Sequence, residues 1–451
     1  MGPDVAIETA GPRRRLQEGI YFRRGTTPPG FFAIVFLRAA KGARAGDVAD
    51  LVAELWKRYQ LLKAGEMPEL PELRVPQRGL QVLLGLGPRA FALPGRAPAI
   101  RAPSALSTSF SSPGRAPGTS ITTDSGIRFE AGAVDLNDAV VALQFTARTA
   151  TAAERPVVET WKCLFDEARE NAGRVALEIA AVYTGAKRDD GRSWIDFHDG
   201  LSNLGPGERQ GVITIPGRDS ETTRQLKNGL YGSFLPEPED AWTVGGTYLA
   251  YMRLYIELAV WHPLKLHLQE ILVGRRKISG DPLLSAGREF PNDIPRAADG
   301  EPPHEADWRT LDVDVRLSSE IGHSHVQRVN HHLSDDGGWR NPANHRIFRQ
   351  GYPFLEPTRS ASGFRVGLNF VSFQWHPASL IQMLDMGDWL GGTNFGGSME
   401  EHDDVPLLRA QAAGVFVVPQ GGFAPPYAGL ERFPGEHALL GEELASANGH
   451  A

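Results

Sequence analysis

The sequence predicts a mixed α+β fold in which antiparallel sheets have helices packed around them. Two observations lead to this class. Short apolar runs that suit buried strands alternate with longer stretches whose apolar residues recur at helical spacing. The order strand–helix–strand also occurs twice in the N-terminal half of the 451-residue chain and recurs in the C-terminal half. This order is typical of ferredoxin-like units, and the chain is long enough for two of them.

The N-terminal unit is expected over residues 31–190, after a flexible arm over residues 1–30. Its predicted strands and helices follow in chain order: a strand at Phe31–Arg38, a helix at Val48–Lys63, strands at Gly79–Leu86 and Asp138–Phe145, a helix at Glu154–Asn171 and a strand at Arg174–Tyr183. We expect Asp47 to cap the first helix, because a carboxylate there can accept from free amide groups. Residues 87–130 are dense in Pro, Ser, Gly and Arg and indicate a long surface connection.

The C-terminal unit is expected over residues 191–435, followed by a small, polar tail over residues 436–451. Its predicted elements are an extended segment at Gly246–Leu258, a helix at His262–Leu272, a strand at Gly367–Gln374, a helix at Pro377–Leu384 and a strand at Gly414–Val418. A connection rich in Pro and Asp covers residues 278–320. The pattern indicates a second, elaborated copy of the first unit.

Composition argues against several classes of protein. The net charge of −7 does not favour binding to nucleic acid or to an anionic membrane. Cys163 is the one cysteine, so neither an internal disulfide nor a multi-thiolate metal site can form. The apolar run Phe31–Leu37 is too short to span a bilayer, and no export signal is visible. These features predict a cytoplasmic protein.

Three polar residues from distant parts of the chain suggest chemistry when they are taken together. His325 lies in Gly322–Arg328, Arg349 lies among apolar residues one loop later, and Asp199 belongs to the upstream fragment Ile195–Gly200. Imidazole, guanidinium and carboxylate are the groups with which a haem enzyme splits peroxide. Each residue also has an ordinary interpretation: a surface histidine, an arginine at a strand end and an Asp-Gly turn.

Seven segments resemble, in the correct order, the motifs of one enzyme family. They are Leu16–Gly19 with Phe31–Arg38, Asp196–Gly200, Gly245–Ala250, Gly274–Lys277 with Gly280–Leu283, Ser324–Val326, Arg349–Tyr352 and Gly367–Pro377. Together they resemble the dye-decolorising peroxidase family. The resemblance implies two ferredoxin-like domains, with one haem b per chain between the sheet and the helices of the C-terminal half.

The resemblance also implies an activity and a role for each site residue. It implies that hydrogen peroxide oxidises a bulky organic reductant, aromatic or dye-like, through a ferryl intermediate. His325 would be the axial ligand of the iron, and Asp199 would move the proton between the peroxide oxygens. Arg349 would stabilise the separating charge, while Arg328 and Arg275 would pair with the haem propionates.

Two departures from the family pattern leave alternatives open. Asp196 and Leu201 stand where the family has glycine and, usually, threonine, and either could change access to the distal pocket. The chain could therefore be a haem-binding, haem-sensing or haem-processing protein of the same fold with little peroxidase turnover. A non-haem metal enzyme using His323–His332 is a weaker alternative, because no His-Glu-x-x-His motif is present.

Several partners stay undetermined by the sequence. Asp385 and Asp388 are candidate acid partners for His325. Neither a homo-oligomer nor an encapsulating partner is decided by the residues, and the physiological reducing substrate is equally open.

Overall fold

The computed structural model describes most of the predicted N-terminal unit and slightly less than half of the C-terminal one. The described residues are 16–20, 29–95, 101–108, 121–122, 128–200, 206–217, 236–280, 324–325, 347–359, 362–380 and 407–421. Among these residues, no helix is both long enough and apolar enough to cross a membrane.

The N-terminal unit has the expected ferredoxin-like arrangement. Its elements in chain order are β1 (Phe31–Ala39), α1 (Ala45–Lys63), β4 (Gln81–Leu86), β7 (Ala139–Ala147), α2 (Ala150–Glu170) and β8 (Leu177–Ala186). The four strands are antiparallel and lie in the order β4-β7-β1-β8. A short hairpin, β2 (Glu66–Met67) and β3 (Leu70–Arg74), follows α1.

The C-terminal unit repeats this strand order. Its strands are β9 (Thr247–Ile256), β10 (Phe348–Pro357), β11 (Phe364–Gln374) and β12 (Leu408–Val418), in the order β10-β11-β9-β12. Its described helices are α3 (Pro206–Ile213), α5 (Leu258–Trp261) and α6 (Leu266–Val273). The strands β5 (Ile121–Thr122) and β6 (Arg128–Asp135) join the same sheet, with β6 parallel to β12. The α+β fold class is therefore confirmed, whereas the domain limits at residues 30, 190 and 435 remain our proposal.

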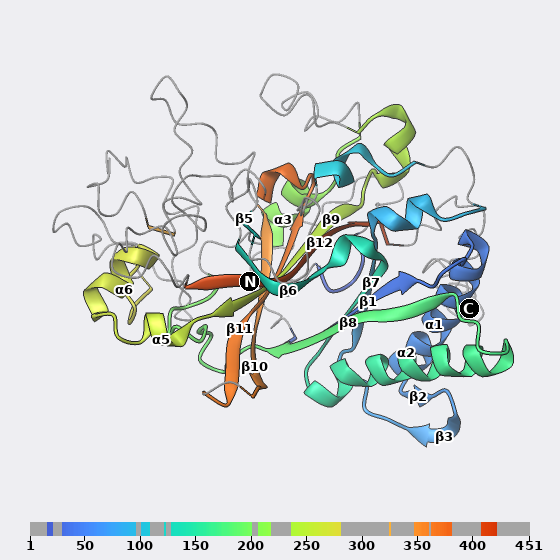
Figure 1. The fold of residues 1–451 in the computed structure, drawn as a ribbon, viewed down its shortest axis with the longest axis horizontal. Coiled ribbons are helices and arrows are strands. Elements are labelled where there is room, and N and C mark those ends of the chain that lie inside the picture. The colour runs from blue at the N-terminus through green and yellow to red at the C-terminus, as the bar shows by residue number, and fades with distance from the viewer. Residues whose placement is uncertain are drawn as a thin grey trace, which may run out of the picture.

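The two units join along their strands and share a core. Val417 on β12 pairs with Leu86 on β4, which makes one continuous sheet. At the far ends of this sheet, the side-chain amide of Asn369 on β11 donates to the carbonyl of Thr184 on β8 at 2.9 Å. The sheet thus curves until its ends approach each other (Figure 1). A buried cluster rich in aromatic residues fills the interior: Phe32, Phe36, Tyr251, Phe348, Tyr352, Phe373 and Phe416.

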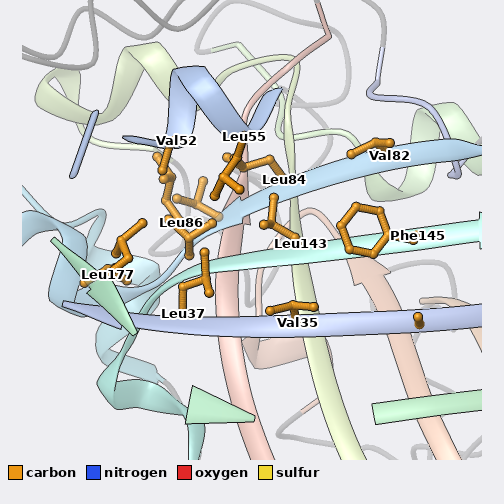
Figure 2. Packing of buried hydrophobic residues seen from close by; sticks show 14 of the residues in the cluster. Val35, Leu37, Val52, Leu55, Val82, Leu84, Leu86, Leu143, Phe145 and Leu177 are labelled. Atoms are coloured by element: carbon orange, nitrogen blue, oxygen red, sulfur yellow. The ribbon is translucent and has the colours of Figure 1, made fainter. Parts of the chain in front are cut away.

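The helices α1 and α2 cover the other face of the N-terminal strands. Alternation along β1 sends Val35 and Leu37 toward the helices while Ile34 and Phe36 face the interior cluster. Figure 2 shows Val35 and Leu37 beside Leu143 of β7, and Val52 and Leu55 of α1 beside Leu84 and Leu86 of β4, all in one buried layer. Burial of this apolar layer is the main force that holds the first unit together.

Several local predictions differ from the structure. The helix α1 begins at Ala45, so Asp47 lies in its first turn and accepts from the backbone amide of Arg44 at 3.2 Å. The helix α2 begins at Ala150, four positions earlier than predicted, because Thr149 caps it. The predicted helix at His262–Leu272 begins later, as α6 at Leu266, and α5 lies just before the predicted range. The strands β2, β3, β5, β6 and β10 were not predicted.

Candidate functional site

A tight hairpin carries the predicted acid Asp199. The backbone amide of Asp199 donates to the carbonyl of Gly191 at 2.9 Å, and that of Ser193 donates to Phe197 at 2.9 Å. The side chains of Ile195 and Phe197 are buried in a small cluster with Trp261 of α5. These contacts hold the backbone of the hairpin in place, while the side chain of Asp199 is exposed.

Arg192 fastens this hairpin to the segment after α6. Its guanidinium donates to the carbonyls of Asp196, Lys277 and Ile278 at 2.6, 2.6 and 2.9 Å. It also donates to Nε2 of His198 at 2.8 Å, since arginine has no acceptor to offer. Burial and the charge of Arg192 lower the pKa of His198. His198 is therefore a neutral acceptor within the hairpin.

The departure at Asp196 is accommodated by the hairpin's turn. Asp196 has φ = +66°, a left-handed conformation that glycine adopts freely and that aspartate tolerates better than most residues. Its carboxylate lies 2.9 Å from a guanidinium nitrogen of Arg188 and 3.7 Å from the ammonium of Lys277. The additional charge is thus compensated by two cations. Leu201, the second departure, lies outside the described residues.

Asp199 lies against the strand that carries Arg349. A Cβ atom placed on Gly351 of β10 would lie 2.3 Å from Oδ2 of Asp199, so only glycine leaves room for the carboxylate. Arg349 precedes Gly351 by two positions, and alternate residues of a strand point to the same face. The predicted carboxylate and guanidinium therefore share one face of β10.

The predicted ligand His325 lies within electrostatic reach of the same arginine. Burial, and to a smaller extent the charges of Arg349 and Arg275, lower the pKa of His325 to about 3. The imidazole is consequently neutral at ordinary pH. A neutral imidazole keeps the nitrogen lone pair that a metal ligand needs.

Arg275 is buried directly after α6. The helix ends at Gly274, whose φ of +85° turns the chain. Nη1 of Arg275 then donates to the carbonyl of Gly280 at 2.8 Å. The charge of Arg275 acts on His325, so Arg275 lies close to the site. Arg328, the other predicted propionate partner, lies outside the described residues, as do Asp385 and Asp388 and all of His323–His332 except Ser324 and His325.

The structure adds a lysine that the sequence analysis did not identify. Lys187, directly after β8, places its ammonium 5.5 Å from the centre of the Tyr352 ring. Burial lowers the pKa of Lys187, the charge of Asp199 acts in the opposite direction and Arg209 adds to the decrease. Lys187 thus lies close to Asp199. A single lysine after a strand has no sequence signal that distinguishes it from a surface residue.

Arg209 of α3 marks the inner side of β10. Its guanidinium lies 3.7 Å from the centre of the Phe348 ring and donates to the carbonyl of Ile20 at 3.2 Å. On this side, Phe348 and Tyr352 are both buried, and Tyr352 stacks on Phe32 at 4.6 Å between ring centres. The position of β10, and hence of Arg349, is therefore fixed by an aromatic layer behind it.

Comparisons with known proteins identify a family for the chain. The model of the Dyp-type peroxidase C-terminal domain matches residues 192–423, which is more than half of the chain. A dye-decolorizing peroxidase from Thermobifida fusca (strain YX) is 30% identical over 161 residues, which cover 34% of this chain. The matched part spans only 31% of that relative.

Solved structures show the same fold at lower identity. A DyP-type peroxidase from Cellulomonas bogoriensis is 22% identical and has a TM-score of 0.56, covering 94% of this chain and all of that chain. A DypB variant from Rhodococcus jostii RHA1 in complex with heme is 16% identical, with a TM-score of 0.52 and coverage of 91% and 97%. The encapsulated DyP-type peroxidase of Mycobacterium smegmatis is 17% identical, with a TM-score of 0.52 and coverage of 89% and 96%. With the match to the family model, we conclude that the chain belongs to the Dyp-type peroxidase family.

Proposed function

We propose that this protein is a haem-dependent peroxidase that uses hydrogen peroxide to oxidise bulky organic molecules. One observation carries the proposal. Asp199 and Arg349 lie on the same face of β10, and the charge of Arg349 acts on His325, although the three residues come from distant parts of the sequence. Family membership, which rests on a match to residues 192–423, supports the same activity.

The residues at the site fit a haem group. Gly351 leaves room for the carboxylate of Asp199, which a side chain at this position would displace. The depressed pKa of His325 keeps the imidazole neutral, as iron coordination requires. We propose that His325 holds the iron of one haem b per chain, and that Arg275 and Arg328 pair with the propionates. Bound haem supplies an iron that binds peroxide and stores its oxidising equivalents.

The chain's own groups then handle protons and charge. The exposed carboxylate of Asp199 takes the proton from one oxygen of hydrogen peroxide and delivers it to the other oxygen, which leaves as water. The permanent charge of Arg349 stabilises the negative charge that develops as the oxygen–oxygen bond breaks. Arg192 and Gly351 hold Asp199 in place for this transfer.

The alternative of a haem binder with little turnover has less support than the sequence suggested. It depended on the departures at Asp196 and Leu201. Because the carboxylate of Asp196 pairs with Arg188 and Lys277, it adds no uncompensated charge to the site. We therefore prefer the peroxidase.

Steady-state turnover of haem-loaded protein with peroxide and a bulky aromatic dye tests this proposal. Asp199→Ala and Arg349→Leu are each expected to lower kcat/KM for peroxide by about 100-fold or more. Asp138→Ala and Arg38→Leu are matched controls, since each removes one partner of an exposed ion pair elsewhere. Equal activity in site and control variants would contradict the assigned roles.

A further inference from the structure

The helix α2 presents a line of large apolar side chains to solvent. Val158, Trp161 and Phe165 are 53%, 54% and 48% exposed. Their spacing of three and four residues puts them on one face of the helix, and the rings of Trp161 and Phe165 stack at 5.1 Å between centres. The opposite face, with Cys163 and Leu164, is buried in the core. Contiguous exposed apolar side chains of this size are typical of interaction sites.

A charge of opposite sign lies at each end of this line. Glu154 precedes Val158 by one helical turn, and Arg169 follows Phe165 by one turn. Both side chains are exposed, and neither forms an ion pair with another of the described residues. We call the five residues Glu154, Val158, Trp161, Phe165 and Arg169 the α2 stripe. Along the helix it runs from negative through apolar to positive over roughly 22 Å.

The α2 stripe is complementary to itself when it is reversed. The point midway between Trp161 and Lys162 is equally far along the helix from Val158 and Phe165, and also equally far from Glu154 and Arg169. A two-fold axis at that point, perpendicular to the helix, places Glu154 opposite Arg169 of a second copy and Val158 opposite Phe165. A parallel pairing would bring like charges together instead, at a cost in free energy. Only an isologous contact requires such self-complementarity.

We propose that the α2 stripe is the centre of an antiparallel contact between two copies of this chain. The hairpin β2–β3 lies beside the stripe, because Glu69 between its strands pairs with Lys162 at 3.0 Å (Figure 1). It contributes Leu70 and Leu73, which are also exposed. This added surface enlarges the apolar area toward the roughly 1,200–2,000 Å² that stable interfaces bury.

Sedimentation equilibrium of the haem-loaded full chain tests the proposal. The unmodified protein is expected to be a dimer at micromolar concentration. Trp161→Glu is expected to raise the dissociation constant about 100-fold, because a carboxylate would replace the central indole of the contact. Leu266→Glu, at a half-exposed leucine of α6 far from α2, is the matched control and should leave the dimer unchanged (Figure 1).

Charge reversal tests the antiparallel arrangement itself. Glu154→Arg and Arg169→Glu should each raise the dissociation constant about tenfold, because each puts two like-charged pairs across the axis. The double variant exchanges the charges and should bring the constant back to within about threefold of the original. A monomeric unmodified protein, a dimer that tolerates Trp161→Glu, or a double variant no better than the single ones would overturn the proposal. Circular dichroism of each variant checks that the fold is intact.

Discussion

Replacing Gly351 by alanine tests whether Asp199 is held at a defined position. Gly351 is not among the residues with positive φ, so alanine can adopt its backbone conformation without strain. The new methyl group would instead lie 2.3 Å from Oδ2 of Asp199 and 3.2 Å from a methyl carbon of Leu368. The substitution therefore acts on the carboxylate and changes no charge.

The size of the effect follows from this distance. An ordinary contact between a Cβ atom and a neighbour begins at 3.4 Å, so the carboxylate must move by about 1 Å. A displacement of this size in a reacting group lowers the rate by about 100-fold, or roughly 2.7 kcal/mol of activation free energy. We expect the rate constant for the reaction with peroxide to fall by this factor in Gly351→Ala, while haem content and thermal stability change little.

Stopped-flow mixing of haem-loaded protein with peroxide measures this rate constant directly. Gly46→Ala is the control, because a Cβ atom there meets no other atom within 4 Å. The variant Asp199→Ala gives a second background, in which the carboxylate that the methyl group displaces is absent. Adding Gly351→Ala to Asp199→Ala should then change the rate less than about twofold.

Two results would refute this reasoning. One is a Gly351→Ala variant with nearly the original rate, which would mean that the position of the carboxylate does not matter. The other is an equal loss in the presence and absence of Asp199, which would trace the effect to the strand and not to the acid.

Three further predictions concern Lys187, Arg192 and His376. Lys187→Met should raise the midpoint temperature of unfolding at neutral pH, because burial lowers the pKa of Lys187 and so disfavours the charged form in the folded protein. An unchanged or lower midpoint in calorimetry would contradict this. Arg192→Leu should lower the free energy of unfolding by about 1–3 kcal/mol and reduce peroxide turnover, because the hairpin of Asp199 loses its hydrogen bonds to Lys277 and Ile278. A denaturant titration that finds full stability would show that these bonds are dispensable. Burial lowers the pKa of His376 to about 4, so the unfolded chain takes up a proton that the folded protein does not as pH falls from about 6.5 to 4. The stability present above pH 6.5 is therefore lost on acidification, by up to about 3 kcal/mol from this residue. His376→Asn, which keeps an acceptor for the amide of Ala378, should flatten that loss, and an equally steep loss in the variant would exclude His376 as its cause.

Much of the fold could be predicted because most of its strands are continuous apolar runs. Phe31–Arg38 and Gly367–Gln374 are buried over much of their length and coincide closely with β1 and β11. The strand β10 was not predicted as a strand, because Arg349, Gly351 and Pro353 interrupt its apolar pattern. These three residues lie on the face toward Asp199. The residue types needed on that face therefore removed the apolar pattern by which a strand is recognised.

The site was predictable only in part, for reasons that differ between its residues. Motif resemblance predicted Asp199, His325 and Arg349 as site residues, but the sequence could not show that a glycine makes room for the carboxylate. The effect of Asp196 could not be inferred either, because it depends on the φ angle and on Arg188 beside it. Lys187 reaches the site only through the folding of β8 against β10.

An absorption spectrum of haem-loaded protein, before and after one equivalent of hydrogen peroxide, shows whether the chain is a haem peroxidase with His325 as its ligand. We expect a Soret band that shifts on addition of peroxide, a slower shift in Asp199→Ala and Arg349→Leu, and an altered or absent band in His325→Ala. A Soret band that does not respond to peroxide would contradict the peroxidase. A band that survives His325→Ala unchanged would contradict the ligand on which the site is built.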